Sequence, residues 1–247
     1  MPGLANLRVH IAPVGFEVDR IVIPAKDTKA DRVWLLVHDN PSEDKSLPYQ
    51  KNLEAQFKKQ KIQVQIARVN RLELFATIKT VREIIQKEMD NDIYVNVGSG
   101  SKIQAIACMM ACMIFKNKNN IKPFYAEAER YAAFEGKQQS FGVKRTIPLP
   151  AYQIQTPKAE LLHALKLIKE NNGKISKKEM AELAEKNNLI TVNAREENHT
   201  QARFASLDQN IIHPLEHDWK FIEVDKIGRS RWIKITQEGI NAAEFLI

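Results

Sequence analysis

The chain has 247 residues, 44% of them apolar and 27% charged, so it is long enough to bury a core and too apolar for a disordered protein. Its net charge is +7, and the whole basic excess lies in residues 1–155, because residues 156–247 hold equal numbers of acidic and basic side chains. A basic half suits an anionic ligand or a nucleic acid, although a solvated basic surface without a partner gives the same count.

The N-terminal segment has no basic stretch followed by a long apolar run, so we expect no secretory signal and a cytoplasmic location. The most apolar stretch, residues 103–115, falls short of the ~20 residues that a membrane span needs, and we expect a buried helix and no membrane association. Cys108 and Cys112 lie four residues apart in it. No Cys or His cluster with ligand spacing surrounds them, so we expect reduced core thiols, no metal and no cofactor.

Short apolar runs alternate with segments of helical spacing through the first part of the chain. The runs predict strands at residues 7–12, 32–38, 62–69, 92–97, 122–126 and 143–149. Pro24 falls in the first interval and predicts a short or kinked helix there. Strands that alternate with helices predict an α/β domain over residues 1–150, with a Rossmann-like, mostly parallel sheet covered on both faces.

A glycine-rich turn, VNVGSGSK at residues 95–102, is the sharpest local feature of this domain. Its glycines let the backbone approach a ligand, while Lys102 and the first amides of the following helix favour an anion. The spacing matches neither GxxxxGK[ST] nor GxGxxG, because Ile103 stands at the third glycine position, and this argues against ATP hydrolysis and dinucleotide redox chemistry.

A second turn, at Gly15 and Phe16, follows the first predicted strand. Both turns should meet at the carboxyl edge of the sheet, where open α/β folds bind ligands. A tight connection without a ligand is the alternative that the residues leave open.

Residues 151–247 predict a second, smaller domain of three helices. Thr156 and Pro157 indicate the start of the first helix, which Asn172-Gly173 should end. Ser176 and Glu179 form a capping box that opens the second helix, and a long connection follows it. We expect the third helix to begin near residue 198 and to stop before Pro214, with Phe204, Leu207 and Ile211 facing inward.

Two alternating stretches, residues 219–225 and 231–236, predict a hairpin with Gly228 at its tip. Three helices and a basic hairpin are the order of a winged helix-turn-helix, in which the third helix enters the major groove of double-stranded DNA and the wing meets the backbone. The base-reading candidates lie opposite the core face of the third helix: His199, Ala202, Arg203, Ser206 and Gln209. The phosphate-contacting candidates lie on the wing: Lys226, Arg229 and Arg231.

The HIAPVGFEVDRI start and the VNVGSGSK turn resemble the CRISPR-associated Rossmann fold (CARF) regulators of archaea, in which such a domain precedes a winged helix. The resemblance covers nearly the whole chain. It implies an antiviral-defence homodimer that holds a cyclic oligoadenylate, made during CRISPR interference, across its two-fold axis. By position, the resemblance assigns these residues to the ligand: Gly15, Phe16, Gly98, Ser99, Gly100, Ser101 and Lys102.

We therefore expect a ligand-responsive, DNA-binding transcription regulator rather than an enzyme, with no catalytic residue assigned. One alternative is a ring nuclease that slowly cleaves its cyclic ligand, with Ser101 and Lys102 as the residues to suspect. A second is an effector ribonuclease, whose Arg-x(4-6)-His motif is matched only by Arg32 and His38 inside a predicted strand. A third is a winged helix that docks onto a protein.

Overall fold

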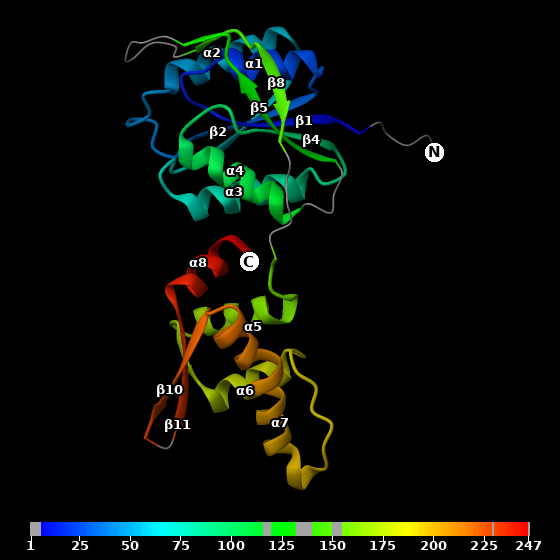
Figure 1. Cartoon of the computed structure of the whole chain (residues 1–247), viewed down its shortest axis with the longest axis vertical. Helices are drawn as coiled ribbons and strands as arrows, with labels where there is room; N and C mark the ends of the chain where they lie inside the picture. The colour runs from blue at the N-terminus through cyan, green and yellow to red at the C-terminus, as the bar shows by residue number, and fades with distance from the viewer. Residues whose placement is uncertain (1–5, 116–119, 132–139, 150–154, 229, 247) are drawn as a thin grey trace. The chain divides into compact units, whose positions relative to one another are not determined.

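The computed structural model describes residues 6–115, 120–131, 140–149, 155–228 and 230–246 (Figure 1). The chain divides into two compact units, Met1–Gln155 and Thr156–Ile247. None of the helices in the described part of the chain is long and apolar enough to span a membrane.

The N-terminal unit is built on a six-stranded sheet of order β3-β2-β1-β4-β5-β8. Its strands are β1 (Arg8–Pro13), β2 (Arg32–His38), β3 (Gln63–Val69), β4 (Asp92–Asn96), β5 (Ile121–Glu127) and β8 (Arg145–Pro148). The first five run parallel, and β8 pairs with β5 antiparallel. The predicted Rossmann-like, mostly parallel sheet is confirmed.

Helices cover both faces of this sheet (Figure 1). On one face lie α1 (Asp19–Asp27) and α2 (Leu47–Lys59), and on the other lie α3 (Leu74–Lys87) and α4 (Lys102–Ile114). As Pro24 predicted, α1 is short, with nine residues. The apolar stretch forms α4, in which Cys108 and Cys112 are free and buried, and burial raises the pKa of Cys108 to about 12.

No described helix follows β5, unlike the earlier strands. The chain instead forms the two-stranded sheet of β6 (Arg130–Tyr131) and β7 (Ser140–Phe141), then β8. The sequence did not predict β6 and β7, which contain two residues each and are too short to show a period.

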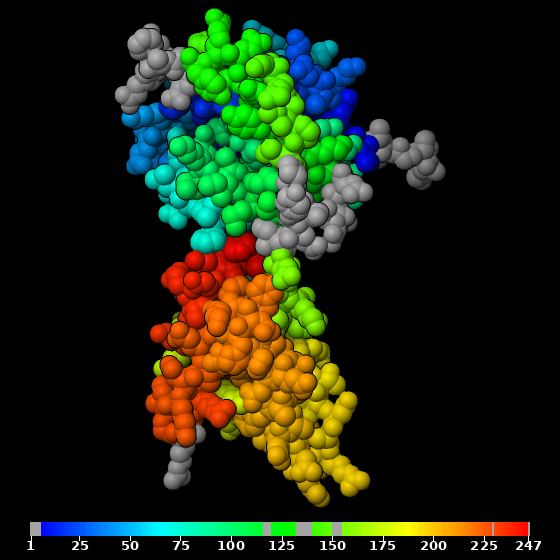
Figure 2. Space-filling model, viewed as in Figure 1, coloured from blue at the N-terminus to red at the C-terminus, as the bar shows by residue number. Residues whose placement is uncertain are grey.

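The C-terminal unit contains α5 (Ala159–Glu170), β9 (Lys174–Ser176), α6 (Lys177–Lys186), α7 (His199–Leu207), β10 (Ile222–Ile227), β11 (Ser230–Ile235) and α8 (Gln237–Leu246). The three strands pair in the order β10-β11-β9 around a core that includes Leu165, Ile168 and Met180. The predicted winged helix order is therefore present, with β9 and α8 added to it. The connection between α6 and α7, yellow in Figure 2, is exposed over most of residues 191–198.

Two predicted helix boundaries were wrong. Thr156 and Pro157 do not open α5, because Lys158 takes the extended N-cap conformation and its carbonyl accepts from the amides of Leu161 and Leu162 at 3.0 and 3.1 Å. Pro214 does not stop the third helix, which continues as π-helical turns over Asp208–Ile212 and Pro214–Asp218. A proline lacks the amide that an α-turn would use, and here the bonds close over five residues, as from Trp219 N to Pro214 O at 3.0 Å.

Candidate ligand site and nucleic-acid interface

The candidate ligand site lies at the carboxyl ends of β1 and β4, which are neighbours in the sheet. The chain continues from β1 to β2 on one side, while β4 lies on the other, so the strand order reverses between β1 and β4. The turns after these strands diverge at such a point, and open α/β sheets bind ligands there.

The two turns touch. Ser99 Oγ donates a 2.8 Å hydrogen bond to the carbonyl of Pro13, and the Ser99 side chain is buried. A Cβ built on Gly15 would lie 3.1 Å from Gly100 Cα. Gly100 itself has a φ of +74°, which favours glycine. The turns therefore form one joint, in which the Ser99 hydroxyl is a link between backbones.

Side chains of the second turn fix its backbone. Asn96 Oδ1 accepts from the amide of Gly98 at 2.8 Å. Ser101 and Gln104 form a capping box at the start of α4, and the Ser101 hydroxyl also donates to the carbonyl of Arg71 at 3.3 Å. Lys102, the first residue of α4, is exposed. The structure thus preforms the turn, and Lys102 makes no ion pair with any residue that the structure describes.

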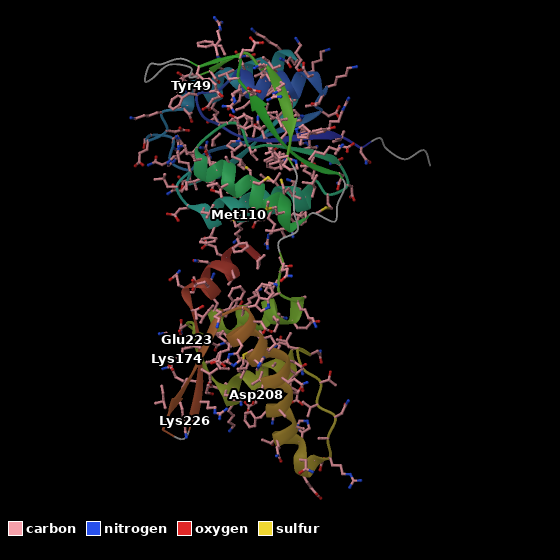
Figure 3. The ribbon with its side chains drawn as sticks, in the orientation of Figure 1. Tyr49, Met110, Lys174, Asp208, Glu223 and Lys226 are labelled. Atoms are coloured by element: carbon pink, nitrogen blue, oxygen red, sulfur yellow. The ribbon has the colours of Figure 1, made fainter. Side chains whose placement is uncertain are left out.

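Phe16 completes the set of predicted ligand residues at this edge. Its half-buried ring meets the ring of Tyr49, labelled on α2 in Figure 3, edge to face at 5.1 Å. The seven predicted residues all lie on the two turns or at the start of α4, within one edge of the sheet.

Glu17 also belongs to this site, and the sequence argument missed it. Its Oε2 accepts from the amide of Gly100 at 3.4 Å and lies against the position of a Cβ on Gly15. Burial raises the pKa of Glu17, while hydrogen bonds from the backbone and the charge of Arg20 act in the opposite direction. The Glu17 carboxylate therefore already accepts a hydrogen bond from one of the amides that an anionic ligand would use.

Arg20, in the first turn of α1, is the second missed residue. It is 6% exposed, its Nε donates to the carbonyl of Ala126 at 2.7 Å, and its guanidinium lies 4.8 Å from the ring centre of Tyr125. Its Nη2 is buried and has no hydrogen bond to any residue that the structure describes. A Cβ on Gly98 would approach this Nη2 to 2.8 Å. A buried guanidinium beneath the turn leaves a positive charge that favours an anion there.

The candidate nucleic-acid interface lies at one end of the C-terminal unit, where the N-terminus of α7 and the tip of the β10–β11 hairpin are found (Figure 1). Lys226, labelled in Figure 3, and Arg231 are exposed and directly opposite each other across the hairpin. Gly228 is at the tip with a φ of +62°, as the hairpin prediction required. Arg229 lies outside the described residues.

The base-reading candidates of α7 are engaged within the unit more than the sequence suggested. His199 Nε2 and Arg203 Nη1 both approach the carboxylate of Glu185 on α6, at 3.0 and 3.4 Å. Ser206 Oγ donates to the carbonyl of Thr191 at 3.1 Å.

Exposure sorts these candidates further. Ala202 is half-buried, and Gln209, in the π-helical turn after α7, is the exposed member of the five. Thr200 and Gln201 are exposed near the start of α7 and were not among the candidates.

Two family models match the chain. The family described as "HFX_2341_N:-like, N-terminal" matches residues 8–131, and the "DUF6293 C-terminal winged helix domain" matches residues 160–247. A curated relative from Methanocaldococcus jannaschii, "Uncharacterized protein MJ1513", is 29% identical over 185 residues, which are 65% of this chain and 55% of the relative. The chain thus spans just over half the length of that protein.

Solved structures with a related arrangement are distant. Csm6 of Enterococcus italicus, bound to cyclic hexa-2'-fluoro-hexa-dAMP, is 11% identical with a TM-score of 0.44, covering 86% of this chain and 56% of its own. Can2 of Sulfobacillus thermosulfidooxidans, in complex with cyclic tetra-adenylate, is 14% identical with a TM-score of 0.41, covering 96% and 63%.

Likenesses at these TM-scores support no inference about function. The predicted combination of domains, a Rossmann-like domain followed by a winged helix, is confirmed by the sheet order and by the winged helix match.

Proposed function

Because the chain belongs to the HFX_2341_N-like family and ends in a DUF6293 winged helix domain, we propose that it is a transcription regulator that senses a nucleotide and binds double-stranded DNA. The observation that carries the proposal is the joint of the β1 and β4 turns, which is preformed at the strand-order reversal and has cations beside it. The winged helix then supplies an exposed basic wing at the same end of the C-terminal unit as the start of α7.

The ligand chemistry follows from the donors at the joint. The first amides of α4, the exposed Lys102 and the buried Arg20 all favour a phosphate over a neutral group. The small residues of the second turn let a bulky sugar-phosphate ring approach the backbone. Together with the sequence resemblance, these features favour a cyclic oligoadenylate as the effector.

A homodimer would suit both the proposed ligand binding and the proposed DNA binding. The outer face of α4 carries apolar side chains at helical spacing, none of them fully buried: Ile103, Ile106, Met110 and Met113. Ile106 is 50% exposed, and Met110 is labelled in Figure 3. Because α4 begins at the ligand turn, pairing through this face would bring two ligand turns together, and dimeric helix-turn-helix proteins read paired half-sites.

We propose binding without turnover. The Ser101 hydroxyl accepts from the amide of Gln104 at 3.2 Å and donates to Arg71, so its hydrogen-bonding capacity serves the turn. Intact cyclic tetra-adenylate after long incubation with excess protein is the expected result, and a linear product would establish a ring nuclease instead.

Calorimetric titration with cyclic tri-, tetra- and hexa-adenylate tests the sensor. We expect saturable binding of one ring size, at least tenfold weaker in Lys102→Ala. The exposed Lys79→Ala on α3 should bind as the wild type does. No binding of any ring, or equal binding by both variants, would reject the assigned site.

DNA binding is tested separately by anisotropy on a labelled duplex over a series of salt concentrations. A steep fall of log affinity with log salt is expected for a phosphate-contacting wing. Absence of DNA binding at low salt would favour the protein-docking alternative for the winged helix.

A further inference from the structure

A cavity in the N-terminal unit lies on the α1 side of the sheet, away from the ligand turns. It has a volume of about 390 Å³ and is bounded by Pro24, Asp27 and Thr28 of the α1 end, by the central strands, and by Thr146 and Pro148 of β8. The cavity exists because α1 is short and because β6, β7 and β8 follow β5 where the earlier strands are followed by a helix.

The floor of the cavity is aromatic. His10 and Tyr94 are partners in the parallel register of β1 and β4, and their rings stack at 5.0 Å with an angle of 17°. Phe124 of β5 meets the His10 ring edge to face at 5.7 Å. Lining of this kind, at this volume, is typical of sites for small planar molecules.

Hydrogen bonding assigns the proton of His10 to Nε2. Thr28 Oγ1 donates to the carbonyl of Pro24 at 2.8 Å, so it accepts from His10 Nε2 at 2.7 Å. His10 Nδ1 is then an acceptor, and it has no hydrogen bond to the described residues. Burial lowers the pKa of His10 to about 3, so the ring is neutral and this acceptor persists at physiological pH.

The two charged groups at the rim of the cavity differ in whether they are paired with another described residue. Lys122 is paired with Asp92 at 2.9 Å and lies over the Tyr94 ring at 5.0 Å. Asp27 is exposed and makes no ion pair within the described part of the chain. Two acceptors are left for a ligand, His10 Nδ1 and the Asp27 carboxylate, beside the hydroxyls of Tyr94 and Thr146, which can donate or accept.

We infer that this cavity binds a planar nitrogen heterocycle that presents N–H donors, stacked on the aromatic floor and hydrogen-bonded to His10 and Asp27. A flat ring without N–H groups would bury the same surface but would leave the buried His10 Nδ1 unpaired, which is costly in an apolar cavity, and would make no charge-assisted hydrogen bond to Asp27. The inference does not depend on the proposed function, because none of the ligand-turn residues lines the cavity.

The test uses two flat probes, 2-aminobenzimidazole and benzofuran, which differ in their N–H donors. We expect saturable binding of the first, with a shift of the His10 ring ¹⁵N resonances, and at least tenfold weaker binding of the second. Asp27→Asn should weaken 2-aminobenzimidazole about tenfold, because it removes the charge of a surface acceptor without disturbing the core.

Two controls locate the effect. Glu43→Gln, which changes an exposed carboxylate elsewhere, and Lys102→Ala, which changes the ligand turn, should both bind 2-aminobenzimidazole like the wild type. Equal binding of the two probes, unshifted His10 resonances, or an unchanged affinity in Asp27→Asn would overturn the inference.

Discussion

The candidate ligand edge of the sheet and the candidate nucleic-acid interface of the winged helix differ in how their polar groups are used. At the ligand edge, Ser99, Gly100 and Ser101 each have a partner inside the chain. On the wing, Lys226 and Arg231 make no ion pair with described residues and are exposed. The first region has the preorganisation that a small ligand needs, whereas the exposed charge of the second suits the proposed binding of a long polyanion, for which precise geometry matters less.

Alanine substitutions at one glycine of each region should show the largest difference between the two regions. Gly100 and Gly228 both have a positive φ, but a Cβ on Gly100 would lie 2.5 Å from Pro13 Cβ, whereas nothing lies within 4 Å of one on Gly228. Gly100→Ala should destabilise the N-terminal unit by about 2–4 kcal/mol, since overpacking adds to backbone strain, and Gly228→Ala should cost the C-terminal unit about 1–2 kcal/mol. Urea unfolding of each variant measures both, and equal losses would contradict the preformed joint.

Glu17→Gln removes a negative charge from the ligand joint. We expect cyclic tetra-adenylate to bind more tightly by on the order of 1–2 kcal/mol at neutral pH, or about tenfold. Because the pKa of Glu17 is raised, the wild type gains its proton as the pH falls, so the two affinities should converge in acid.

The effect of Glu17→Gln on the stability of the fold should have the same direction and the same pH dependence as its effect on ligand affinity. A raised carboxyl pKa means that stability falls as pH rises from the unfolded value through the folded one, so Glu17→Gln should raise the melting temperature at neutral pH and lose this advantage in acid. Calorimetry between pH 5 and 8, with Glu43→Gln as control, checks both effects. Weaker ligand binding by the variant at every pH would show that Glu17 contacts the ligand favourably.

Serine-to-alanine changes at the two capping boxes sharpen the comparison, because the boxes have the same geometry. Ser101 Oγ and Ser176 Oγ each accept from the third helical amide at 3.2 Å. Each substitution should cost about 1 kcal/mol in urea unfolding. Only Ser101→Ala should also weaken ligand binding, and a ligand effect of Ser176→Ala would argue against two separate functions.

Neutralising the wing should give the smallest effects. Lys226→Gln and Arg231→Gln should each lower DNA affinity by about 0.5–1 kcal/mol and reduce the slope of log affinity against log salt by about 1. Anisotropy titrations at several salt concentrations measure the slope, with the exposed Lys169→Gln on α5 as control. Unchanged slopes in both wing variants would remove the wing from the interface.

Local patterns predicted much of this fold. The capping box at Ser176 and the strands from residue 7 to residue 126 lie within two residues of their observed bounds, because burial imposes a period that a short stretch of sequence displays. The predictions failed where the local structure depends on residues that are distant in the sequence or has no sequence signal. The three residues of β9 are a strand only because β11 pairs with them, and Pro214 is accommodated by π-helical turns that no local signal announces.

The sequence predicted the two turns of the candidate ligand site but missed the charged residues Glu17 and Arg20. Glycines and Lys102 are visible in the VNVGSGSK turn, but the partners of Ser99 and Arg20 lie 86 and 106 residues away in the sequence. Glu17 and Arg20 stood within the quoted HIAPVGFEVDRI segment, yet their contacts to Gly100 and Ala126 depend on the strand order. A single sequence carries no signal for such pairs.

Helix α1 is shared by two places that could each hold a molecule. Its first turn contributes Arg20 beneath the ligand turn, and its last residues, together with Thr28, border the aromatic cavity. If a molecule in the cavity shifts this nine-residue helix and thereby changes the affinity for the effector, the effector must change the affinity of the cavity by the same factor. Titrating each compound in the presence of the other would close this thermodynamic cycle, and equal factors would make α1 a coupling element within one domain.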